Sequence, residues 1–524
     1  MKSKKNFNKK TPKKKKETLS ERTLKNSGYN MLGTIISRAG GLIFSIILAR
    51  LLLPELFGIY SLVLSIITIA VTFTDLGIGN TLTRYVSDAL GKGNKSKASA
   101  YIKYLLKFRF ILVMAVIFII ILFGKFISNT IFEKPEIYLP LIFACLYLLM
   151  KVLFGFFKSL FTALKDLRSV AVMQFISQLS RIVLVLLAIV LISTEKYIVS
   201  GVFVALALAF LITSLVAFLL IDKKVLFNKK SKKEEINKKR ILSYLGFVSI
   251  VSVSLTFFGS IDILMLGKFV SSEYIGFYRV ALSLVSSVAG LLGFGGVLLP
   301  VFTQTHNERL QRAFHKSFRY IISLAIPAVV GVILVSRYFI LAIYGKEYLT
   351  ASIPLSILAF MILISPLVAF YSSLFQAKEK PKLLAKLVST SLIINIIINY
   401  VLIKYLLQFG QEYAILGAGI GTIFSRAFYL GFLIIKTTQV EKIKTRFSVF
   451  IQPLIASGVM ALFLINFPKM VDMNWMWGIF EIIIGILIYF ITLYLIKGIK
   501  QEDINLFKKI FLDKIGNISK NKKF

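Results

Sequence analysis

The sequence is poor in the side chains that most enzymes and disulfide-bonded proteins need. One of its 524 residues is cysteine, Cys145, so no intrachain disulfide can form. Its two histidines, His306 and His315, share one basic connector and are interpreted as ordinary loop residues. No GxxxxGKS/T phosphate-binding loop occurs, so this chain is not expected to use ATP. No DxD pair occurs either, and we predict no enzyme, no catalytic residue, no metal and no cofactor.

Acidic residues are also scarce, whereas apolar and basic residues are abundant. The chain has 24 Asp and Glu against 64 Lys and Arg, a formal net charge of +40, yet it is 57% hydrophobic with a mean hydropathy of +0.80. Long apolar runs alternate with connectors of at most about 20 residues, too short for a soluble catalytic domain. The basic residues are split among separate connectors, so nucleic-acid binding is not expected. The pattern predicts an all-α integral membrane protein.

Fourteen apolar runs are long enough to cross a bilayer as helices. They cover residues 29–53, 57–86, 108–128, 138–157, 170–192, 198–221, 244–267, 275–302, 319–341, 353–376, 386–406, 413–436, 449–467 and 477–497. Lys and Arg are concentrated in alternate connectors, beginning with the N-terminal tail. Positively charged connectors stay in the cytoplasm. The sequence therefore predicts a multi-pass plasma-membrane protein with both termini cytoplasmic, whose basic segments contact anionic lipids.

The chain also resembles itself at a nearly constant offset. Residues 48–60 (LARLLLPELFGIY) match residues 266–278 (LGKFVSSEYIGFY), an offset of 218. Two later matches follow in order, from Ser159 to Ser373 and from Gly201 to Gly417. They predict two copies of a six-helix unit in the same orientation, because each copy has an even number of spans. Such parallel repeats are typical of transporters with a substrate site between the halves.

The repeat divides the chain into six predicted segments. They are a basic cytoplasmic tail (1–27), an N-lobe (28–221), a basic linker (222–243), a C-lobe (244–436), two additional helices (437–497) and a second basic tail (498–524). The two lobes are expected to form a transporter with its substrate site between them. The additional helices are expected to pack beside it or to form a side groove.

Several cations lie inside the predicted spans, where a charge is costly unless it faces a cavity or a partner. Polar residues accompany them at helical spacing, which places these faces around a central wet cavity. The alternative is that the polar side chains only bond helices to one another. The candidate substrate-binding residues are Arg38, Lys151, Gln178, Arg181, Arg279, Asn395 and Arg426.

Acids inside the spans are fewer. Asp75 and Asp262 are candidates for coupling transport to an ion, and Asp262 has the alternative role of pairing with Arg279. Because deep cations outnumber deep acids, the cavity is expected to attract anions. The planar guanidinium fork suits phosphate oxygens. This balance favours a substrate that bears a phosphate or diphosphate over an organic cation.

Three segments resemble a known family. They are SRAGGLIFSIILARLLLPELFGIYSLVLSI, DLGIGNTLTRYVS and SLFTALKDLRS, and the chain resembles the polysaccharide transporter family along essentially its whole length. These are O-antigen and lipid-linked oligosaccharide flippases, related to the lipid II flippase and to multidrug and toxic compound extrusion transporters. The resemblance implies two six-helix lobes around a V-shaped cavity, two extra helices and alternating access. Relatives hold the lipid-linked diphosphate with cavity cations, a role that Arg38 fits best here.

The resulting hypothesis is a flippase that moves a polyprenyl- or dolichyl-linked saccharide from the inner to the outer leaflet for surface glycan assembly. Its partners would be that substrate, anionic lipids and glycan-assembly enzymes, with no nucleic acid. Outward movement of an anion is downhill by about 2.3 kcal/mol per charge per 100 mV, so the drive is either the membrane potential or a coupled ion. Two alternatives are a cation-coupled multidrug antiporter and a membrane glycosyltransferase or polymerase.

Overall fold

The computed structural model describes residues 19–221, 238–293, 302–303, 307–378, 380–470 and 475–499, and within these ranges the chain is helical and contains no strand. Most of the two predicted basic tails and of the basic linker lies outside the described residues. So do His306 and residues 294–301 of the predicted helix 275–302.

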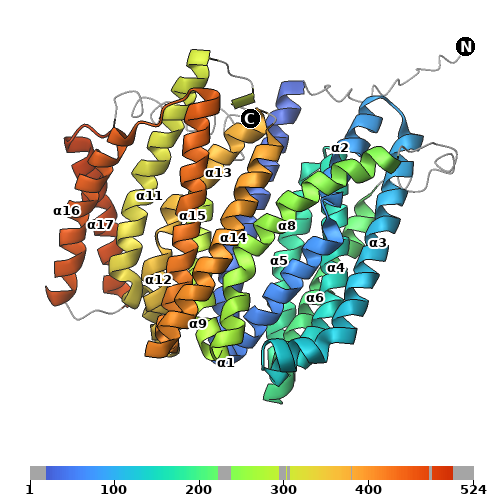
Figure 1. The fold of residues 1–524 in the computed structure, drawn as a ribbon, viewed down its shortest axis with the longest axis horizontal. Coiled ribbons are helices and arrows are strands. Elements are labelled where there is room, and N and C mark those ends of the chain that lie inside the picture. The colour runs from blue at the N-terminus through green and yellow to red at the C-terminus, as the bar shows by residue number, and fades with distance from the viewer. Residues whose placement is uncertain are drawn as a thin grey trace, which may run out of the picture.

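The described helices form two lobes and an additional pair (Figure 1). The first lobe contains α1 (Leu19–Asp75), α2 (Ile78–Gly91), α3 (Lys95–Phe126), α4 (Tyr138–Ala163), α5 (Leu167–Leu191) and α6 (Glu195–Leu220). The second lobe contains α8 (Lys238–Phe269), α9 (Ser272–Leu292), α11 (Asn307–Tyr344), α12 (Ser352–Leu358), α13 (Met361–Ala377), α14 (Pro381–Leu406) and α15 (Gln411–Glu441). The pair α16 (Ile451–Met470) and α17 (Trp475–Leu495) packs on α11 at the left margin of the view. Five shorter turns join these helices: η1 (Ile127–Ile131), η2 (Pro135–Ile137), η4 (Lys346–Ala351), η5 (Leu407–Phe409) and η6 (Phe447–Phe450).

Twelve of the described helices are long and apolar enough to cross a membrane, and thirteen when α12 and α13, bent by 45°, count as one span. The helix α1 itself contains two spans. A straight helix of its 57 residues would be about 85 Å long, against a hydrocarbon core of about 30 Å. Leu53 leaves the helical conformation (φ 59°, ψ 171°) before Pro54, which has no N–H to donate. The chain reverses there (Figure 1), so each of the fourteen predicted spans has a counterpart.

The prediction of an unbroken helix over residues 57–86 was wrong. The chain leaves α1 after Asp75 and re-enters a helix at Ile78. Between them Leu76 and Gly77 adopt positive φ angles of 38° and 75°. Glycine adopts such angles at little cost, which is why the break falls at this position. The Asp75 carboxylate accepts a hydrogen bond from the Gly79 N–H at 3.3 Å and so caps the start of α2.

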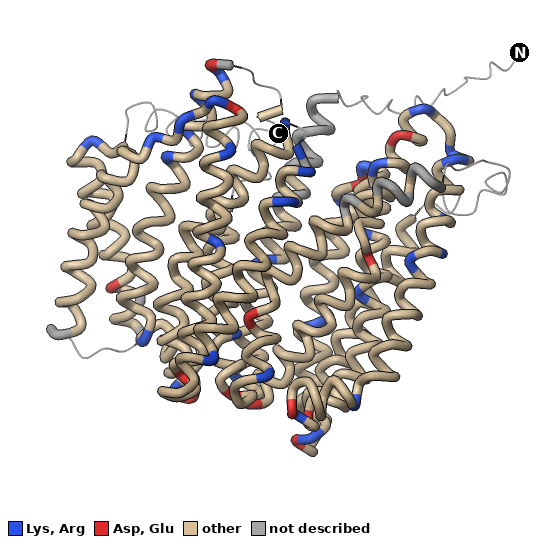
Figure 2. The backbone as a smooth tube through the Cα atoms, viewed as in Figure 1, with Lys and Arg blue, Asp and Glu red and all other residues tan. Residues whose placement is uncertain are grey.

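Charge marks one end of the molecule. Along the upper edge in Figure 2, Lys and Arg predominate over a few Asp and Glu, whereas the two signs are mixed along the lower edge. We call these the basic end and the opposite end. The helix α1 begins and α17 ends at the basic end (Figure 1).

The buried core is continuous at the opposite end and divided at the basic end. One cluster joins both lobes through residues such as Leu48, Leu62 and Tyr278. Toward the basic end two separate clusters form. One surrounds Phe161 of the first lobe and includes Ile241 and Leu245 at the start of α8, and the other surrounds Phe314 of the second lobe. A cavity between the lobes is therefore expected between the shared core and the basic end.

The two lobes meet through residues that the repeat relates to each other. A Cβ atom added to Gly58 would lie 1.6 Å from the carbonyl oxygen of Ser272, and one added to Gly276 would lie 2.2 Å from that of Pro54. The offset of 218 relates Gly58 to Gly276 and Pro54 to Ser272. The contact is thus made twice, in reciprocal form, as two-fold related repeats require. No side chain larger than hydrogen fits at either glycine without displacing backbone.

At the opposite end, two basic residues related by the repeat each make a polar contact with the other lobe. Arg50 of α1 donates to the carbonyl oxygens of Ile343 and Ala342 at 2.6 and 2.8 Å, at the end of α11. Its repeat partner Lys268 of α8 forms an ion pair with Glu133, which follows α3, and this bond lowers the pKa of the Glu133 carboxyl. Each lobe therefore holds the other at the opposite end.

Candidate functional site

A cavity of about 810 Å³ lies between the lobes, above their shared core. Its walls come from α1, α4, α5 and α6 of the first lobe and from α8, α9, α13 and α15 of the second. Five basic residues line it, and none of its described lining residues is acidic. These five are Arg38, Lys151, Arg181, Arg279 and Arg426. All five were predicted as substrate-binding residues, and the structure brings them together around one space.

None of the five cations forms an ion pair with a described carboxylate. Arg181 stacks on an aromatic ring instead, with its guanidinium carbon 4.2 Å from the centre of Phe44, and also donates to Gln178. The Lys151 ammonium lies 5.0 Å from the centre of the Tyr147 ring. Contacts with aromatic faces hold a cation in place without neutralising its charge. The cavity therefore has a positive potential.

The cations are spread along the membrane normal. Arg279 lies about 10 Å from the start of α9 at the opposite end, and Arg38 lies about 22 Å from the kink at Leu53. The Arg38 guanidinium lies over Gly290 of α9, where an added Cβ would be 3.2 Å from it. An anionic group that moves through the cavity would therefore meet cations at several depths.

Two predicted substrate-binding residues are not among the residues that line the cavity. The Gln178 amide donates to the Ser37 carbonyl at 3.3 Å, and the side chain fits against Gly40 of α1. Asn395 is fully buried in α14. Gln178 corresponds to the alternative in which polar side chains bond helices to one another, whereas the Asn395 amide makes no hydrogen bond among the described residues. Tyr60 and Tyr147 line the cavity and were missed, although the repeat had matched Tyr60 with Tyr278.

A second polar cluster lies in the second lobe around Asp262. This carboxylate is 2% exposed and accepts hydrogen bonds from Tyr278 at 3.0 Å and from Asn399 at 2.8 Å. Asp262 therefore has these hydrogen bonds in place of the ion pair with Arg279 that was the alternative prediction from the sequence. The side-chain oxygens of Asn395 and Asn399 are buried without a hydrogen-bond partner. The Asn399 nitrogen faces the carboxylate, whereas its side-chain oxygen lies against Gly421 of α15.

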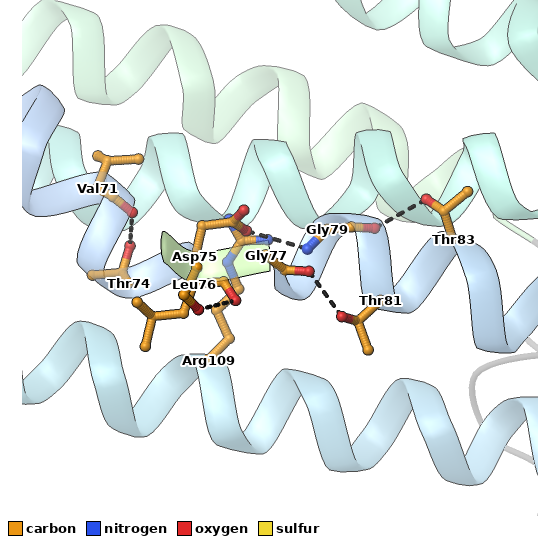
Figure 3. A network of polar contacts seen from close by, with 10 residues as sticks. Val71, Thr74, Asp75, Leu76, Gly77, Gly79, Thr81, Thr83 and Arg109 are labelled. Carbon is orange, nitrogen blue, oxygen red and sulfur yellow. Dashed lines mark hydrogen bonds and ion pairs between the residues drawn. The ribbon is translucent and has the colours of Figure 1, made fainter. Parts of the chain in front are cut away.

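Asp75 forms an ion pair with Arg109 of α3 at 2.8 Å (Figure 3). Arg109 is 5% exposed, and Gly155 of α4 leaves the room that its guanidinium occupies. Sequence reasoning missed Arg109 because it stands at the edge of a predicted span and was counted with the basic connector. Helix α3 in fact begins earlier, at Lys95, after Asn94 accepts a hydrogen bond from the Lys97 N–H.

We expect Asp75→Asn to lower the free energy of unfolding by about 2–3 kcal/mol, because Arg109 would remain buried without its counter-ion. This expected loss is smaller than is usual for a buried ion pair, because the Asp75 side chain is 34% exposed to solvent. The matched control is Asp88→Asn, whose partner Lys92 is exposed, and a loss below about 0.5 kcal/mol is expected there. Denaturant unfolding in detergent measures both, and equal effects would contradict a structural role for the pair.

Two repeated lobes around a cationic cavity define a two-lobe membrane transporter fold. The solved lipid II flippase MurJ, in an inward closed conformation, superposes with a TM-score of 0.71 at 16% identity, covering 89% of this chain and 98% of that one. An inward-facing multidrug resistance MATE transporter superposes with a TM-score of 0.61 at 15% identity, covering 80% and 99%. The predicted fold class is confirmed.

A family described as "Polysaccharide biosynthesis protein" matches residues 23–306, more than half of the chain. The chain belongs to this family, which confirms the resemblance noted in the sequence. It is 24% identical over 272 residues to a probable low-salt glycan biosynthesis flippase, Agl15, of Haloferax volcanii. That match covers 51% of this chain and about half, 56%, of the relative's length.

Proposed function

We propose that this protein is a flippase that moves a polyprenyl- or dolichyl-linked (di)phosphate saccharide from the inner to the outer leaflet of the plasma membrane. The observation that carries this is the cavity with five cations and no described acid. Arginine forks bind phosphate oxygens in pairs and keep their charge at any physiological pH. The saccharide would occupy the cavity, and the lipid tail would stay in the bilayer.

The basic end faces the cytoplasm in this proposal, because Lys and Arg gather there and positive connectors stay on the cytoplasmic side. The cavity would receive its substrate from that side. Contacts of the basic end with anionic lipids, and with glycan-assembly enzymes that make and use the substrate, belong to the same proposal.

The functions named for two similar proteins support the proposal. Agl15 is named as a glycan biosynthesis flippase and MurJ as a lipid II flippase. A multidrug antiporter shares the fold, but its organic cations would be repelled by the five cavity cations. Transport is preferred over a glycosyltransferase or polymerase because the described site offers charge and space for a phosphate-bearing molecule.

For the coupling ion we propose Asp262 and set Asp75 aside. Asp75 already has Arg109 as its counter-ion. Asp262 has hydrogen bonds but no ion pair among the described residues, and spare oxygens of Asn395 and Asn399 lie on the neighbouring helix. Hard monovalent cations prefer such oxygen ligands. The membrane potential remains the alternative drive.

Purified protein in liposomes tests the proposed function. With a fluorescent polyprenyl-diphosphate disaccharide, we expect label to become accessible on the far leaflet at a rate that empty liposomes lack. The same assay with a fluorescent organic cation should show no transport. Movement of the organic cation but not of the lipid-linked sugar would favour the antiporter and contradict the flippase.

A further inference from the structure

Arg426 lines the cavity and also contacts α8 one turn from the buried carboxylate of Asp262. It lines the cavity from α15, near the middle of that helix. Its Nη2 atom donates to the carbonyl oxygen of Phe258, and Phe258 precedes Asp262 by one turn of α8. The two side chains form no ion pair among the described residues, and charges about one helical turn apart in a low-dielectric interior still act on each other.

The guanidinium of Arg426 is held loosely. Its bond to Phe258 measures 3.3 Å, beyond the usual range for an N–H donor. Its guanidinium carbon lies 5.1 Å from the centre of the Phe258 ring. The buried Nε atom has no hydrogen-bond partner among the described residues. Little else competes with Asp262 or with a cavity anion for this positive charge.

Few charged or titratable groups face Asp262, so its own charge state determines the net charge beside Arg426. Tyr278 of α9 and Arg426 of α15 are the titratable or charged groups that face it, and α14 contributes the Asn399 amide, which does not titrate. The fully buried Thr422 of α15 also lies beside the carboxylate. A single positive charge bound at Asp262, either Na⁺ or a proton, would cancel the negative charge that Arg426 experiences.

We propose that the charge state of Asp262 sets how strongly Arg426 attracts the diphosphate of the substrate. This inference rests on the proposed flippase function. While Asp262 is an anion, its negative charge partly offsets the positive potential that Arg426 creates in the cavity. A cation bound at Asp262 neutralises this charge, which raises the positive potential in the cavity and strengthens diphosphate binding. By linkage, a diphosphate in the cavity strengthens cation binding by the same factor. Arg426 is therefore a substrate-binding residue whose affinity for the diphosphate depends on the charge at Asp262.

The repeat supplies an internal control. The offset of 218 relates Asp262 to Phe44 in the first lobe. Arg181 stacks on Phe44 at 4.2 Å, so this cavity arginine has an aromatic ring where Arg426 has a carboxylate nearby. Arg181 should contribute to diphosphate binding without responding to a cation at Asp262.

The experiment measures the affinity of purified protein for farnesyl diphosphate, in Na⁺ and in choline at constant ionic strength. For the wild type we expect Na⁺ to tighten binding by about tenfold, within the usual range of coupling between sites. Arg426→Gln should bind more weakly and lose the response, and Arg181→Gln should bind more weakly and keep it. Asp262→Asn should bind as the Na⁺-loaded wild type does, in either salt.

A second series in choline, from about pH 8 to about pH 6, distinguishes a proton from Na⁺. Because the probe itself gains protons near pH 6, only the difference between wild type and Arg426→Gln is interpreted. If wild-type binding responds to neither cation, or if Arg426→Gln keeps the response, the inference is overturned and the flippase proposal stands. Failure of the wild type to bind farnesyl diphosphate would instead count against the proposed function.

Discussion

Replacing Arg38 and Arg181 together by alanine should reduce flipping of a lipid-linked saccharide by about a hundredfold or more. Each arginine offers charge-assisted hydrogen bonds worth about 1.5–3 kcal/mol, and a loss of 1.4 kcal/mol is a factor of ten. Both side chains line the cavity without a described carboxylate partner, so their charge is available to a phosphate. Initial flipping rates in liposomes measure the effect.

The matched control replaces two cations outside the cavity, Arg337 of α11 and Lys404 of α14. Neither residue lines the cavity. This double variant removes the same net charge, and we expect its flipping rate to remain within about twofold of wild type. If the cavity variant and the control behave alike, bulk charge explains the effect and the arginines have no specific role.

A disulfide between α1 and α8 at the basic end should block flipping completely and reversibly. The hydroxyl oxygens of Thr72 and Thr256 are 3.0 Å apart, and the adjacent rings of Phe73 and Phe257 pack edge to face at 6.2 Å. Cysteines at 72 and 256 therefore fall within bonding reach. If the cavity opens to the cytoplasm by parting these helices, oxidation should stop transport and a reductant should restore it.

The variant is made in a Cys145→Ala background, which removes the native thiol. Each single cysteine variant serves as a control and should flip normally under oxidation. Cross-linked protein, identified by its shifted mobility on a gel, that still flips at the wild-type rate would show that α1 and α8 stay together throughout transport.

Much of the fold could be predicted from the sequence because membranes impose simple rules. Span length follows from bilayer thickness, and each predicted span has a helical counterpart. The repeat was visible because identical backbone contacts need identical residues. Gly58 and Gly276 match in sequence, since each must admit the backbone of the other lobe.

The breaks inside spans could not be predicted in the same way. Hydropathy does not change where α1 ends at Asp75, because Leu76, Gly77 and Ile78 are as apolar as the residues before them. The break falls at Gly77, and one glycine inside an apolar run does not by itself distinguish a break from a continuous helix. The bend between α12 and α13 is likewise invisible to an average over a window of residues.

The site was predictable in its charges and not in its helix contacts. Five of the seven predicted substrate-binding residues line the cavity, because a cation in a span must face water or a partner. Gln178 and Asn395 share helical faces with such positions yet lie against other helices. Uncharged amides are tolerated in either place, so periodicity alone does not separate the two roles.

The central claim is that the cavity binds the phosphate headgroup, and native mass spectrometry tests it most directly. Purified protein is offered equal amounts of a polyprenyl diphosphate and of the matching polyprenol, whose tail is identical. The account predicts that wild type retains the diphosphate form and that the Arg38→Ala and Arg181→Ala double variant does not. Equal retention of the two lipids by wild type, or undiminished retention of the diphosphate by the double variant, would contradict it.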